Sequence, residues 1–537
     1  MSSIESACRD LIEDILAGNI ADEAGLCRAK KKVSLQCRLD SLPGNPEILS
    51  YAREGERERV LEVLQRKPVR TISGVAVIAA MTSPAPCPHG KCVPCPGGPD
   101  SKFRSPLSYM GLEPAARRAF ECGFDPYVQV SSRLRQLSDI GHPVDKAELI
   151  IMGGTFTARP PQYQEWFVRR CLEAMNEFGG SSKGGSRSVN TIEEAQAVNE
   201  TSRVRNVGMT VETRPDWMGT EHIDGILRLG ATKVELGVQS TDDGVLLRIR
   251  RGHTVAQSVT ANRLVRDSGL KVGFHMMPGL PGSSMEKDAR MFEDLFSDER
   301  FMPDYLKIYP TLVTEGTELA GMYDRSEYEP PGTEEAAQLV GRIKSILPVW
   351  TRLQRVQRDI PAPQILAGVK KSNLRQLAGE RLGAMGKSCR CIRCREVGHR
   401  ALHGVEPGNI ELGAVTYRAC GGIEHFISFE DRELDVLIGF LRLRFPASPH
   451  SSELSGSALV RELHVYGPLV PLKTRAKEAE WQHRGYGEEL LIEAERMAAQ
   501  AGFKKIAVTS GIGVREYYRR LGYRRDGPYM AKTLRDS

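Results

Sequence analysis

The 537-residue chain has no apolar run long enough to cross a membrane, the longest being GVAVIAAM at residues 74–81. Its first 18 residues also lack the basic start and apolar stretch of a secretion signal, and their pattern predicts an acidic amphipathic helix instead. We therefore expect a cytoplasmic protein with no membrane contact, in a compartment where thiols stay reduced. The length implies two to four domains.

The chain also lacks a strong excess of one charge, with a net charge of +6 at pH 7. The basic residues are nevertheless concentrated: Arg28 to Arg70 holds 11 Lys and Arg against 6 Asp and Glu. Clustered cations gain affinity for nucleic acids by releasing counterions. We expect Lys30, Lys31 and Lys32 to contact phosphates, the alternative being a solvated helical face.

After residue 70, short runs rich in β-formers alternate with amphipathic helical stretches. This order predicts an α/β fold with parallel strands and crossover helices, as in a full or partial βα barrel. From about residue 411, consecutive antiparallel strands, a helix and two strand-like runs predict an α+β domain. The expected domains are a helical basic region (1–70), the barrel (71–360), a linker with a cysteine site (361–410) and the α+β domain (411–537).

Three cysteines, Cys87, Cys92 and Cys95, lie in PCPHGKCVPCPGG (86–98), a stretch that proline and glycine keep out of helix and strand. Structural zinc sites use four ligands, whereas three thiolates suit a [4Fe-4S] cluster with one open iron. Such an iron binds S-adenosylmethionine, whose reductive cleavage yields a 5′-deoxyadenosyl radical. The alternative is zinc with a distant fourth ligand such as His89.

Features of the predicted strands favour the cluster. MGGTF (152–156) closes the first strand after the cysteines, where radical-SAM barrels place a glycine turn against the methionine end of the cofactor. Glu212 and Glu235 are expected to close later strands, at the carboxyl ends where barrel active sites gather. We assign Gly153, Gly154 and Glu235 to S-adenosylmethionine binding.

A second group, Cys389, Cys391 and Cys394, lies in SCRCIRCREVGHR. This compact spacing suits Zn2+ in a structural role better than a radical cluster. The fourth ligand stays open among His399, His403 and Cys420. The alternative is three free cysteines.

Near the C-terminus, QHRGYGEELLIEAERMA (482–498) places glycines before an amphipathic helix, where backbone N–H groups attract a pyrophosphate. The strand RELHVYG before it and KKIAVTSGIGVREYYRRLGY after it match the order of the acetyl-CoA site in GNAT-type acetyltransferases. We expect Tyr518, or its neighbour Tyr517, beside the sulfur, where it can protonate a departing thiolate; the alternative is a core tyrosine pair. The other expected acetyl-CoA contacts are Glu462, Leu463, His464, Val465, Gly485, Tyr486, Gly487 and Glu488.

Taken together, CPHGKCVPCPGGPDS, VDKAELIIMGGTF, VETRPDW, ELGVQS, RGHT, HMMPGLPG and RELHVYG resemble the catalytic subunit of Elongator and its single-chain archaeal and bacterial relatives. The resemblance runs from about residue 67 to LGYRRDGPYM. It implies a radical-SAM barrel followed by a GNAT domain that modifies uridine 34 of tRNA, building a carboxymethyl group at carbon 5. It also implies that Lys146 contacts acetyl-CoA from the barrel side and that tRNA is the nucleic acid bound by the basic region.

The two expected half-chemistries complement each other. Uracil carbon 5 is a poor nucleophile, so a bond to the acetyl methyl carbon needs radical activation, and thioester hydrolysis then leaves a carboxymethyl group. A protein lysine acetyltransferase with a structural iron–sulfur cluster is the main alternative, and a tRNA-binding scaffold with degenerate sites is another. The electron donor and the oligomeric state, with a homodimer as one option, stay open.

Overall fold

The computed structural model describes residues 3–64 without 38, 40 and 54, then 74–179, 190–467 and 485–534. Within these ranges, every helix is too short or too polar to pass through a lipid bilayer. The expected α/β architecture is confirmed, with one parallel sheet and one mixed sheet of seven strands each.

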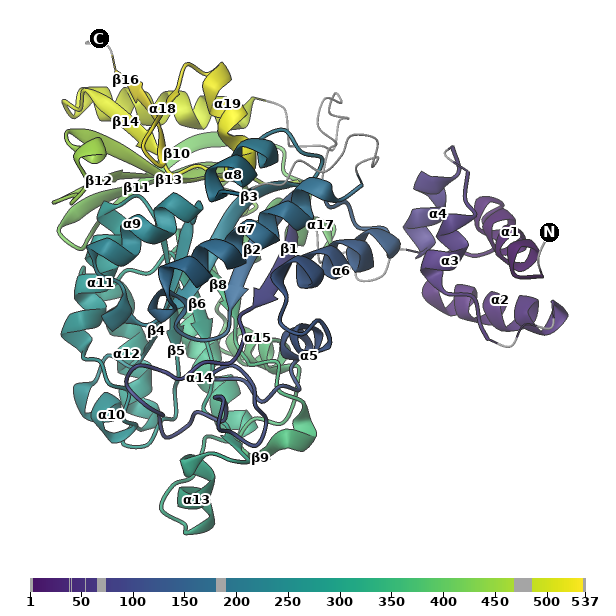
Figure 1. Cartoon of the computed structure of the whole chain (residues 1–537), viewed down its shortest axis with the longest axis horizontal. Coiled ribbons are helices and arrows are strands. Elements are labelled where there is room, and N and C mark those ends of the chain that lie inside the picture. The colour runs from purple at the N-terminus through teal and green to yellow at the C-terminus, as the bar shows by residue number, and fades with distance from the viewer. Residues whose placement is uncertain are drawn as a thin grey trace.

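The N-terminal residues form a small helical bundle beside the rest of the molecule, drawn in purple in Figure 1. Its core contains Leu11, Ile12, Leu26 and Val60, all nearly inaccessible to solvent. The amphipathic helix expected at the start of the chain is its first element. The helices are α1 (Ser3–Leu16), α2 (Glu23–Gln36), α3 (Asn45–Ser50) and α4 (Arg57–Leu64).

The large sheet has seven strands in the order β1-β2-β3-β4-β5-β6-β8, and each neighbouring pair is parallel. The first and last strands do not pair with each other, so the barrel is open. A short pair, β7 (Val313–Thr314) and β9 (Ile365–Ala367), lies apart from it. The barrel strands are β1 (Ala76–Met81), β2 (Lys146–Met152), β3 (Arg205–Thr213), β4 (Lys233–Gln239), β5 (Lys271–Met276), β6 (Tyr305–Ile308) and β8 (Arg352–Arg355).

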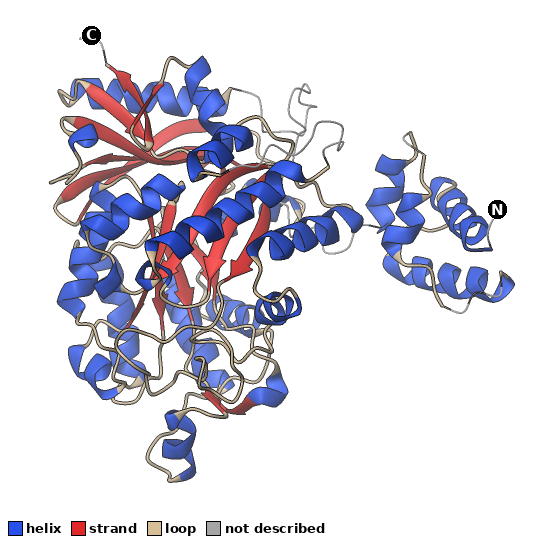
Figure 2. Cartoon of the chain, viewed as in Figure 1, coloured by secondary structure: helices blue, strands red, loops and turns tan. Residues whose placement is uncertain are grey.

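Helices cover the outer face of this sheet, as the blue ribbons around the red strands in Figure 2 show. They are the crossover helices that the alternating sequence pattern predicts. The helices from the barrel to the linker are α5 (Pro114–Glu121), α6 (Pro126–Asp139), α7 (Pro161–Glu177), α8 (Ile192–Asn199), α9 (Thr220–Leu229), α10 (Asp243–Arg248), α11 (Val255–Asp267), α12 (Met285–Ser297), α13 (Glu318–Asp324), α14 (Thr333–Ile346), α15 (Leu374–Ala384), α16 (Ile392–Arg395) and α17 (Val397–Ala401).

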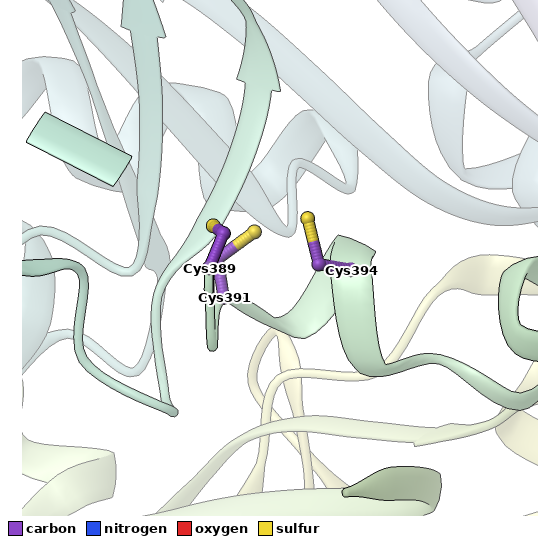
Figure 3. A group of neighbouring side chains, drawn as sticks. All are labelled: Cys389, Cys391 and Cys394. Carbon is purple, nitrogen blue, oxygen red and sulfur yellow. The ribbon is translucent and has the colours of Figure 1, made fainter. Parts of the chain in front are cut away.

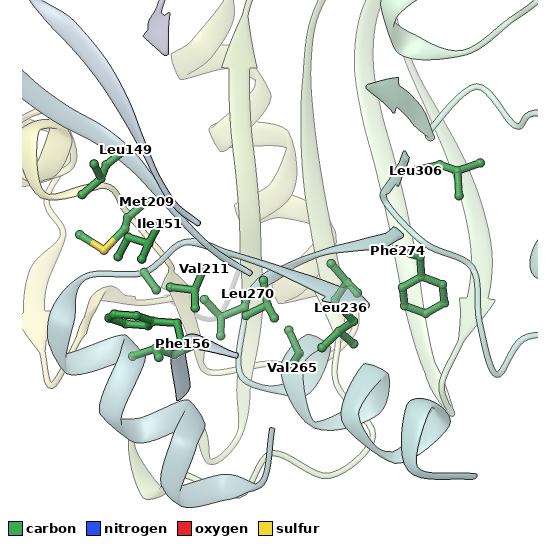
Figure 4. Packing of buried hydrophobic residues seen from close by; sticks show 14 of the residues in the cluster. Leu149, Ile151, Phe156, Met209, Val211, Leu236, Val265, Leu270, Phe274 and Leu306 are labelled. Atoms are coloured by element: carbon green, nitrogen blue, oxygen red, sulfur yellow. The ribbon is translucent and has the colours of Figure 1, made fainter. Parts of the chain in front are cut away.

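The barrel strands have an apolar outer face and a polar inner face. Along β2, Leu149 and Ile151 are fully buried, and they pack in the core between sheet and helices with Phe156 (Figure 4). The alternate residues Lys146 and Glu148 line an internal cavity. Because strand side chains alternate between the two faces, one strand supplies both the core and the cavity wall.

The C-terminal sheet has the order β10-β11-β12-β13-β14-β16-β15. The first four strands are antiparallel neighbours, whereas β13 and β14 are parallel and α18 connects them. The sequence pattern did not reveal β10, because its alternating exposed residues include few large apolar ones. The elements are β10 (Glu411–Ala419), β11 (Gly422–Asp431), β12 (Val436–Phe445), β13 (Ser457–Val465), α18 (Tyr486–Gln500), β14 (Lys505–Val508), α19 (Arg515–Arg520), β15 (Arg524–Asp526) and β16 (Tyr529–Thr533).

A buried network of four arginines and four carboxylates joins the C-terminal sheet to the amino ends of the barrel strands. At its centre Asp304, which precedes β6, bonds Arg461 of β13 at 2.6 Å and lies 3.5 Å from Arg266 of α11. Arg461 also contacts Glu424 of β11 at 2.7 Å. We call this set the core ion network; its members are Arg266, Asp267, Asp304, Glu424, Arg442, Arg444, Arg461 and Glu462.

Candidate active site

One cavity of about 1620 Å³ passes along the inside of the open barrel. At the carboxyl ends of the strands its wall includes Cys87, Cys92 and Cys95. At the amino ends it includes residues of β13, α18 and α19 from the C-terminal sheet. The cavity therefore connects the two parts of the chain that the sequence marks as chemically active.

Each sulfur of the cysteine loop, residues 86–98, lies near a hydrogen-bonding group. Cys95 accepts from the Ser108 amide at 3.4 Å, and Cys87 lies 3.6 Å from the Thr155 hydroxyl. The His89 ring lies between Cys87 and Cys92, 3.0 Å from each sulfur. Burial and the charges of nearby arginines lower the pKa of His89 to about 4, so its ring is neutral at pH 7.

The spacing of these sulfurs fits an iron–sulfur cluster better than one zinc ion. Zinc held by thiolates at about 2.3 Å requires ligand atoms close to one another. Among the described residues, donor atoms gather within 4.8 Å in two other places, Cys389–Cys391–Cys394 and Glu212–Glu235–His275, and not in the cysteine loop. The thiolates of a cubane cluster bind different irons, so they suit this wider spread.

The glycine turn after β2 lies where the sequence predicts it. Gly153 and Gly154 have φ values of 117° and 107°, which are accessible to glycine. A Cβ on Gly153 would lie 2.4 Å from the Thr82 hydroxyl, so the close approach of β1 and β2 also requires glycine. Gly154 lines the cavity beside the cysteine loop.

Glu235 is not at a strand end, contrary to the sequence expectation. It is the third residue of β4, which continues to Gln239, and its carboxylate points into the barrel interior. There it contacts Lys307, His275 at 3.0 Å and Lys233 at 3.4 Å. Burial alone would raise the pKa of Glu235, but the charges of Lys307 and Lys233 hold it well below its ordinary value.

The Glu212–Glu235–His275 group does not need a metal ion. Glu212 lies one residue before the end of β3, as expected, and lines the cavity. The Lys307 ammonium lies 3.2 Å from its carboxylate. The Lys307 ammonium contacts both carboxylates and supplies the positive charge that a cation would bring. Lys307 is a site residue that sequence reasoning missed, because a single lysine in a strand carries no distinctive pattern.

In the C-terminal sheet, strands β13 and β14 separate at the cavity. Their parallel pairing covers Ser457 to Val460 and ends there, whereas β13 continues beside β12 to Val465. The expected acetyl-CoA segment, Glu462 to Val465, is this continuation, and all four residues line the cavity. Glu462 also accepts hydrogen bonds from Tyr305 and from Arg442, the latter at 2.9 Å.

The start of α18 faces the same cavity. Gly485 precedes the helix with φ 93°, and Tyr486, Gly487 and Glu488 form its first turn. The N-terminus of a long helix attracts anions such as a pyrophosphate, and α18 has 15 residues. The first part of the expected motif, residues 482–484, lies outside the described residues.

The two candidate tyrosines occupy different places. Tyr518 is 5% exposed and packs against Tyr523 in the core, although it also reaches the cavity wall. The Tyr517 hydroxyl lies 3.1 Å from where a Cβ on Gly487 would be, at the start of α18. Burial and the Glu488 charge raise the pKa of Tyr517 to about 12. Burial also raises the pKa of Tyr518, so both phenols remain protonated at neutral pH and can donate a proton.

The second cysteine group lies between the barrel and the C-terminal sheet. Figure 3 shows the Cys389, Cys391 and Cys394 side chains gathered together, and their sulfurs lie within 4.8 Å of one another. Hydrogen bonds from Cys389 and Cys394 hold the pKa of Cys391 well below its ordinary value. The three thiols have the closeness that one zinc ion requires.

No candidate fourth ligand completes this group among the described residues. Cys420 lies elsewhere, with Asn262 at 3.1 Å and the Arg300 carbonyl at 3.3 Å. His399 contacts Glu396 at 3.2 Å. The adjacent residues Arg393, Glu396 and His399 line the large cavity, so this group supports one side of its wall.

Lys30 does not have the exposure that phosphate binding requires. It is 7% exposed, and its ammonium donates to Asn45 inside the N-terminal bundle. Lys31 and Lys32 follow Lys30 on the same helix, and both of their side chains are exposed to solvent. The expectation for Lys30 is therefore wrong, and the exposed basic residues of this helix are Arg28, Lys31 and Lys32.

The amino ends of the barrel strands form a basic rim that sequence reasoning missed. Six strands begin with residues that line the cavity next to the C-terminal sheet. Only Lys146 among them was expected to contact acetyl-CoA, and burial lowers its pKa. A positively charged residue at the start of one strand is unremarkable by itself. The repeated charge becomes visible only when the first residues of all the barrel strands are compared. The five basic residues are Lys146, Arg205, Lys233, Lys271 and Arg352, and the sixth strand begins with Tyr305.

Comparison with family models matches three consecutive parts of the chain. Residues 4–72 match the ELP3 N-terminal domain, residues 87–295 the Radical SAM superfamily and residues 303–383 the Radical_SAM C-terminal domain. The first of these includes the N-terminal bundle, and the second begins at Cys87.

Similar proteins extend over nearly the whole chain. The tRNA uridine(34) acetyltransferase of Methanocaldococcus infernus is 53% identical over 498 residues, covering 92% of each chain. Elongator complex protein 3 of Homo sapiens is 42% identical, covering 100% of this chain and 97% of its own. The solved structure of Methanocaldococcus infernus Elp3 with an N-terminal deletion superposes with a TM-score of 0.76 at 49% identity, covering 86% of this chain and 100% of that chain.

Proposed function

The chain belongs to the family of Elongator complex protein 3 and the tRNA uridine(34) acetyltransferases, and from this premise we propose that it converts uridine 34 of tRNA to 5-carboxymethyluridine. The acetyl group comes from acetyl-CoA, and radical chemistry with S-adenosylmethionine activates it. The enzyme is thus an acyltransferase with a radical-SAM barrel.

The observation that supports this proposal most directly is the single cavity between the two half-sites. If the radical-SAM domain and the acetyltransferase domain acted independently, they would not need a shared cavity. Here the cysteine loop and the acetyl-CoA segment of β13 line the same internal space. An acetyl group held at one end can therefore reach a base held in the barrel without entering bulk water.

The cysteine loop is the proposed binding site for the [4Fe-4S] cluster, with Cys87, Cys92 and Cys95 as ligands and Gly153 and Gly154 beside S-adenosylmethionine. When bound, the cluster and S-adenosylmethionine supply a one-electron route to hydrogen abstraction. The neutral His89 ring and the buried charges of the barrel hold the surrounding wall in place. Reduction of the cluster also requires an external one-electron donor.

The acetyl-CoA site is proposed at the other end of the cavity. The N-terminus of α18 receives the pyrophosphate, and the part of β13 beyond its pairing with β14 receives the pantetheine amide groups. Lys146 of the basic rim adds a positive charge from the barrel side. Tyr518, with Tyr517 beside it, protonates the departing thiolate.

Two further assignments belong to the same proposal. Zn2+ is held by Cys389, Cys391 and Cys394 and stabilises the wall formed by α16 and α17. Lys31 and Lys32 of the N-terminal bundle contact tRNA phosphates. We also propose a cytoplasmic location, because thiols in the proposed ligand positions stay reduced in that compartment.

Anaerobic incubation with tRNA, S-adenosylmethionine, acetyl-CoA and dithionite as the one-electron donor, followed by mass analysis of nucleosides, tests the proposal. We expect a carboxymethyl group on uridine 34 and none when S-adenosylmethionine is omitted. Acetylation of a protein amine without S-adenosylmethionine, and no change in the tRNA, would instead establish the alternative of a protein lysine acetyltransferase.

A further inference from the structure

The segment RRGHT, residues 250–254, packs against the cysteine loop although the proposed chemistry assigns it no role. The Val93 amide donates to the Ile249 carbonyl at 3.0 Å, which ties the two loops together. Gly252 has φ 78°, and a Cβ there would lie 2.7 Å from His89. The two loops therefore fit closely, and the side chain of Arg251 is directed at the cysteines.

Arg251 donates a hydrogen bond to a sulfur of the proposed cluster site. Its Nη1 lies 3.6 Å from Cys92 Sγ, and its Nη2 donates to the Gly237 carbonyl at 2.7 Å. A Cβ on Gly237 would lie 2.6 Å from that Nη2, so the strand makes room for the guanidinium. The arrangement holds a positive charge beside one thiolate ligand.

A second arginine nearby is neutralised, but Arg251 is not. Arg214 forms two hydrogen bonds with Asp216, at 2.9 and 2.8 Å, and a third with the Arg251 carbonyl at 2.7 Å. Among the residues that the structure describes, no carboxylate lies within ion-pair distance of Arg251. Its Nε atom is also buried without a hydrogen-bond partner. The charge of Arg251 is therefore directed at the cysteine site and not cancelled locally.

We propose that Arg251 is a positioning residue that raises the reduction potential of the cluster held by Cys87, Cys92 and Cys95. This inference rests on the proposed cluster site. Reduction adds one electron from an external one-electron reductant, and no bond is made or broken and no proton is taken up by the protein. A cationic donor at a ligand sulfur stabilises the more negative reduced state, and hydrogen bonds to sulfurs are an established control of such potentials.

The experiment measures cluster content first and potential second. Wild type, Arg251→Gln, Arg251→Lys and the control Arg250→Gln are reconstituted anaerobically, and iron and sulfide are counted. Arg250 is a matched control because it is adjacent in sequence, half exposed and paired with Glu318. The reduced fraction is then followed by electron paramagnetic resonance during a titration with dithionite and redox mediators.

For Arg251→Gln we expect about a tenfold lower ratio of reduced to oxidised cluster at fixed solution potential, which is about 59 mV for one electron. Arg251→Lys should recover most of this loss, and Arg250→Gln should match wild type. A fully loaded Arg251→Gln protein with the wild-type potential would overturn the inference. So would an Arg251→Lys protein shifted as far as Arg251→Gln.

If Arg251→Gln cannot hold the cluster, the lysine variant decides: full loading with a potential at or close to that of wild type supports the inference, and any other result overturns it. Absence of iron and sulfide from the wild type would instead overturn the cluster assignment within the proposed function. The two failures are thus distinguishable.

Discussion

At the scale of single residues, the two tyrosines of α19 offer a direct test of thioester chemistry. Tyr518→Phe removes a proton donor from the cavity wall, so acetyl-CoA hydrolysis stimulated by tRNA should fall about 100-fold. Tyr517→Phe, which changes the neighbouring phenol, should have the smaller effect. Free CoA thiol is measured with and without tRNA.

Binding of tRNA is the control for these variants, since neither tyrosine lies in the N-terminal bundle. Unchanged hydrolysis by Tyr518→Phe would remove this residue from the acid role. A larger loss with Tyr517→Phe would transfer the role to Tyr517.

The lysines of α2 form a second residue-level prediction. Lys31→Gln with Lys32→Gln should weaken tRNA binding and reduce the slope of log affinity against log salt by about 2, because two phosphate contacts are lost. Lys30→Gln should instead lower the stability of the bundle, since Lys30 donates to buried Asn45. Fluorescence anisotropy at several salt concentrations measures the slope. An unchanged slope in the double variant would place the tRNA surface elsewhere.

Lys30 and Glu235 show where sequence reasoning fails at this scale. Residue type indicates that a lysine is basic, but burial of Lys30 depends on Asn45, which belongs to another helix. Similarly, Glu235 was expected at a strand end because β4 was expected to end early. The burial of a carboxylate inside the barrel requires Lys307, 72 residues away, and no local pattern contains that partner.

At the scale of elements, the three-cysteine group makes a prediction about metal content. Cys391→Ser should remove the zinc, measured by plasma mass spectrometry, while the iron on the cysteine loop is retained. The affinity for acetyl-CoA should also decrease, because Arg393 in the cavity wall lies between two of these ligands and Glu396 and His399 follow shortly after the last one. Cys27→Ser, at an exposed position of α2, is the control.

Full zinc content in Cys391→Ser would contradict the assignment of this site. Loss of zinc with unchanged acetyl-CoA affinity would show that the metal serves folding and does not support the acetyl-CoA site.

Most elements could be predicted from the sequence, whereas their mutual arrangement could not. Alternating β-rich and amphipathic segments predict the parallel strands and crossover helices, because each pattern is local. The glycine turn at Gly153 was also predictable, since a positive φ restricts residue type. The placement of the acetyl-CoA segment at the amino ends of the barrel was not, because contacts such as Tyr305 with Glu462 join residues 157 positions apart.

At the scale of the whole molecule, the core ion network should dominate the stability of the junction. Asp304→Asn removes the carboxylate shared by three arginines and leaves buried charges uncompensated. We expect a loss of about 3–5 kcal/mol in the free energy of unfolding. Asp298→Asn, which disrupts a surface pair with Arg300, should cost less than about 1 kcal/mol. Urea unfolding of both variants measures the difference, and equal losses would contradict this role of the network.

The same junction predicts a dependence on pH. Burial would raise the pKa of Glu462, but the charges of Lys271 and Arg442 lower it from 4.5 to about 2 in the folded protein. Because the folded pKa is the lower one, the stabilisation is complete above about pH 4.5 and is lost as the pH falls toward 2. It is on the order of 3 kcal/mol at neutral pH.

Comparison of wild type with Glu462→Gln by urea unfolding at pH 7 and at steps below pH 4.5 tests this dependence. The difference in unfolding free energy between the two proteins should shrink as the pH falls. A difference that stays constant across the range would show that Glu462 has an ordinary pKa.

The core ion network also bears on how such a protein can change during evolution. The barrel contributes Asp267 and Asp304 against Arg266, and the C-terminal sheet contributes Arg442, Arg444 and Arg461 against Glu424 and Glu462. Each side thus has a surplus of one sign that only the other side neutralises. A gene fusion that exchanged one half for a homologue would succeed only if the incoming half carried the matching charges. The two halves are therefore expected to be inherited together, and engineered chimaeras should transfer both faces of the junction as one unit.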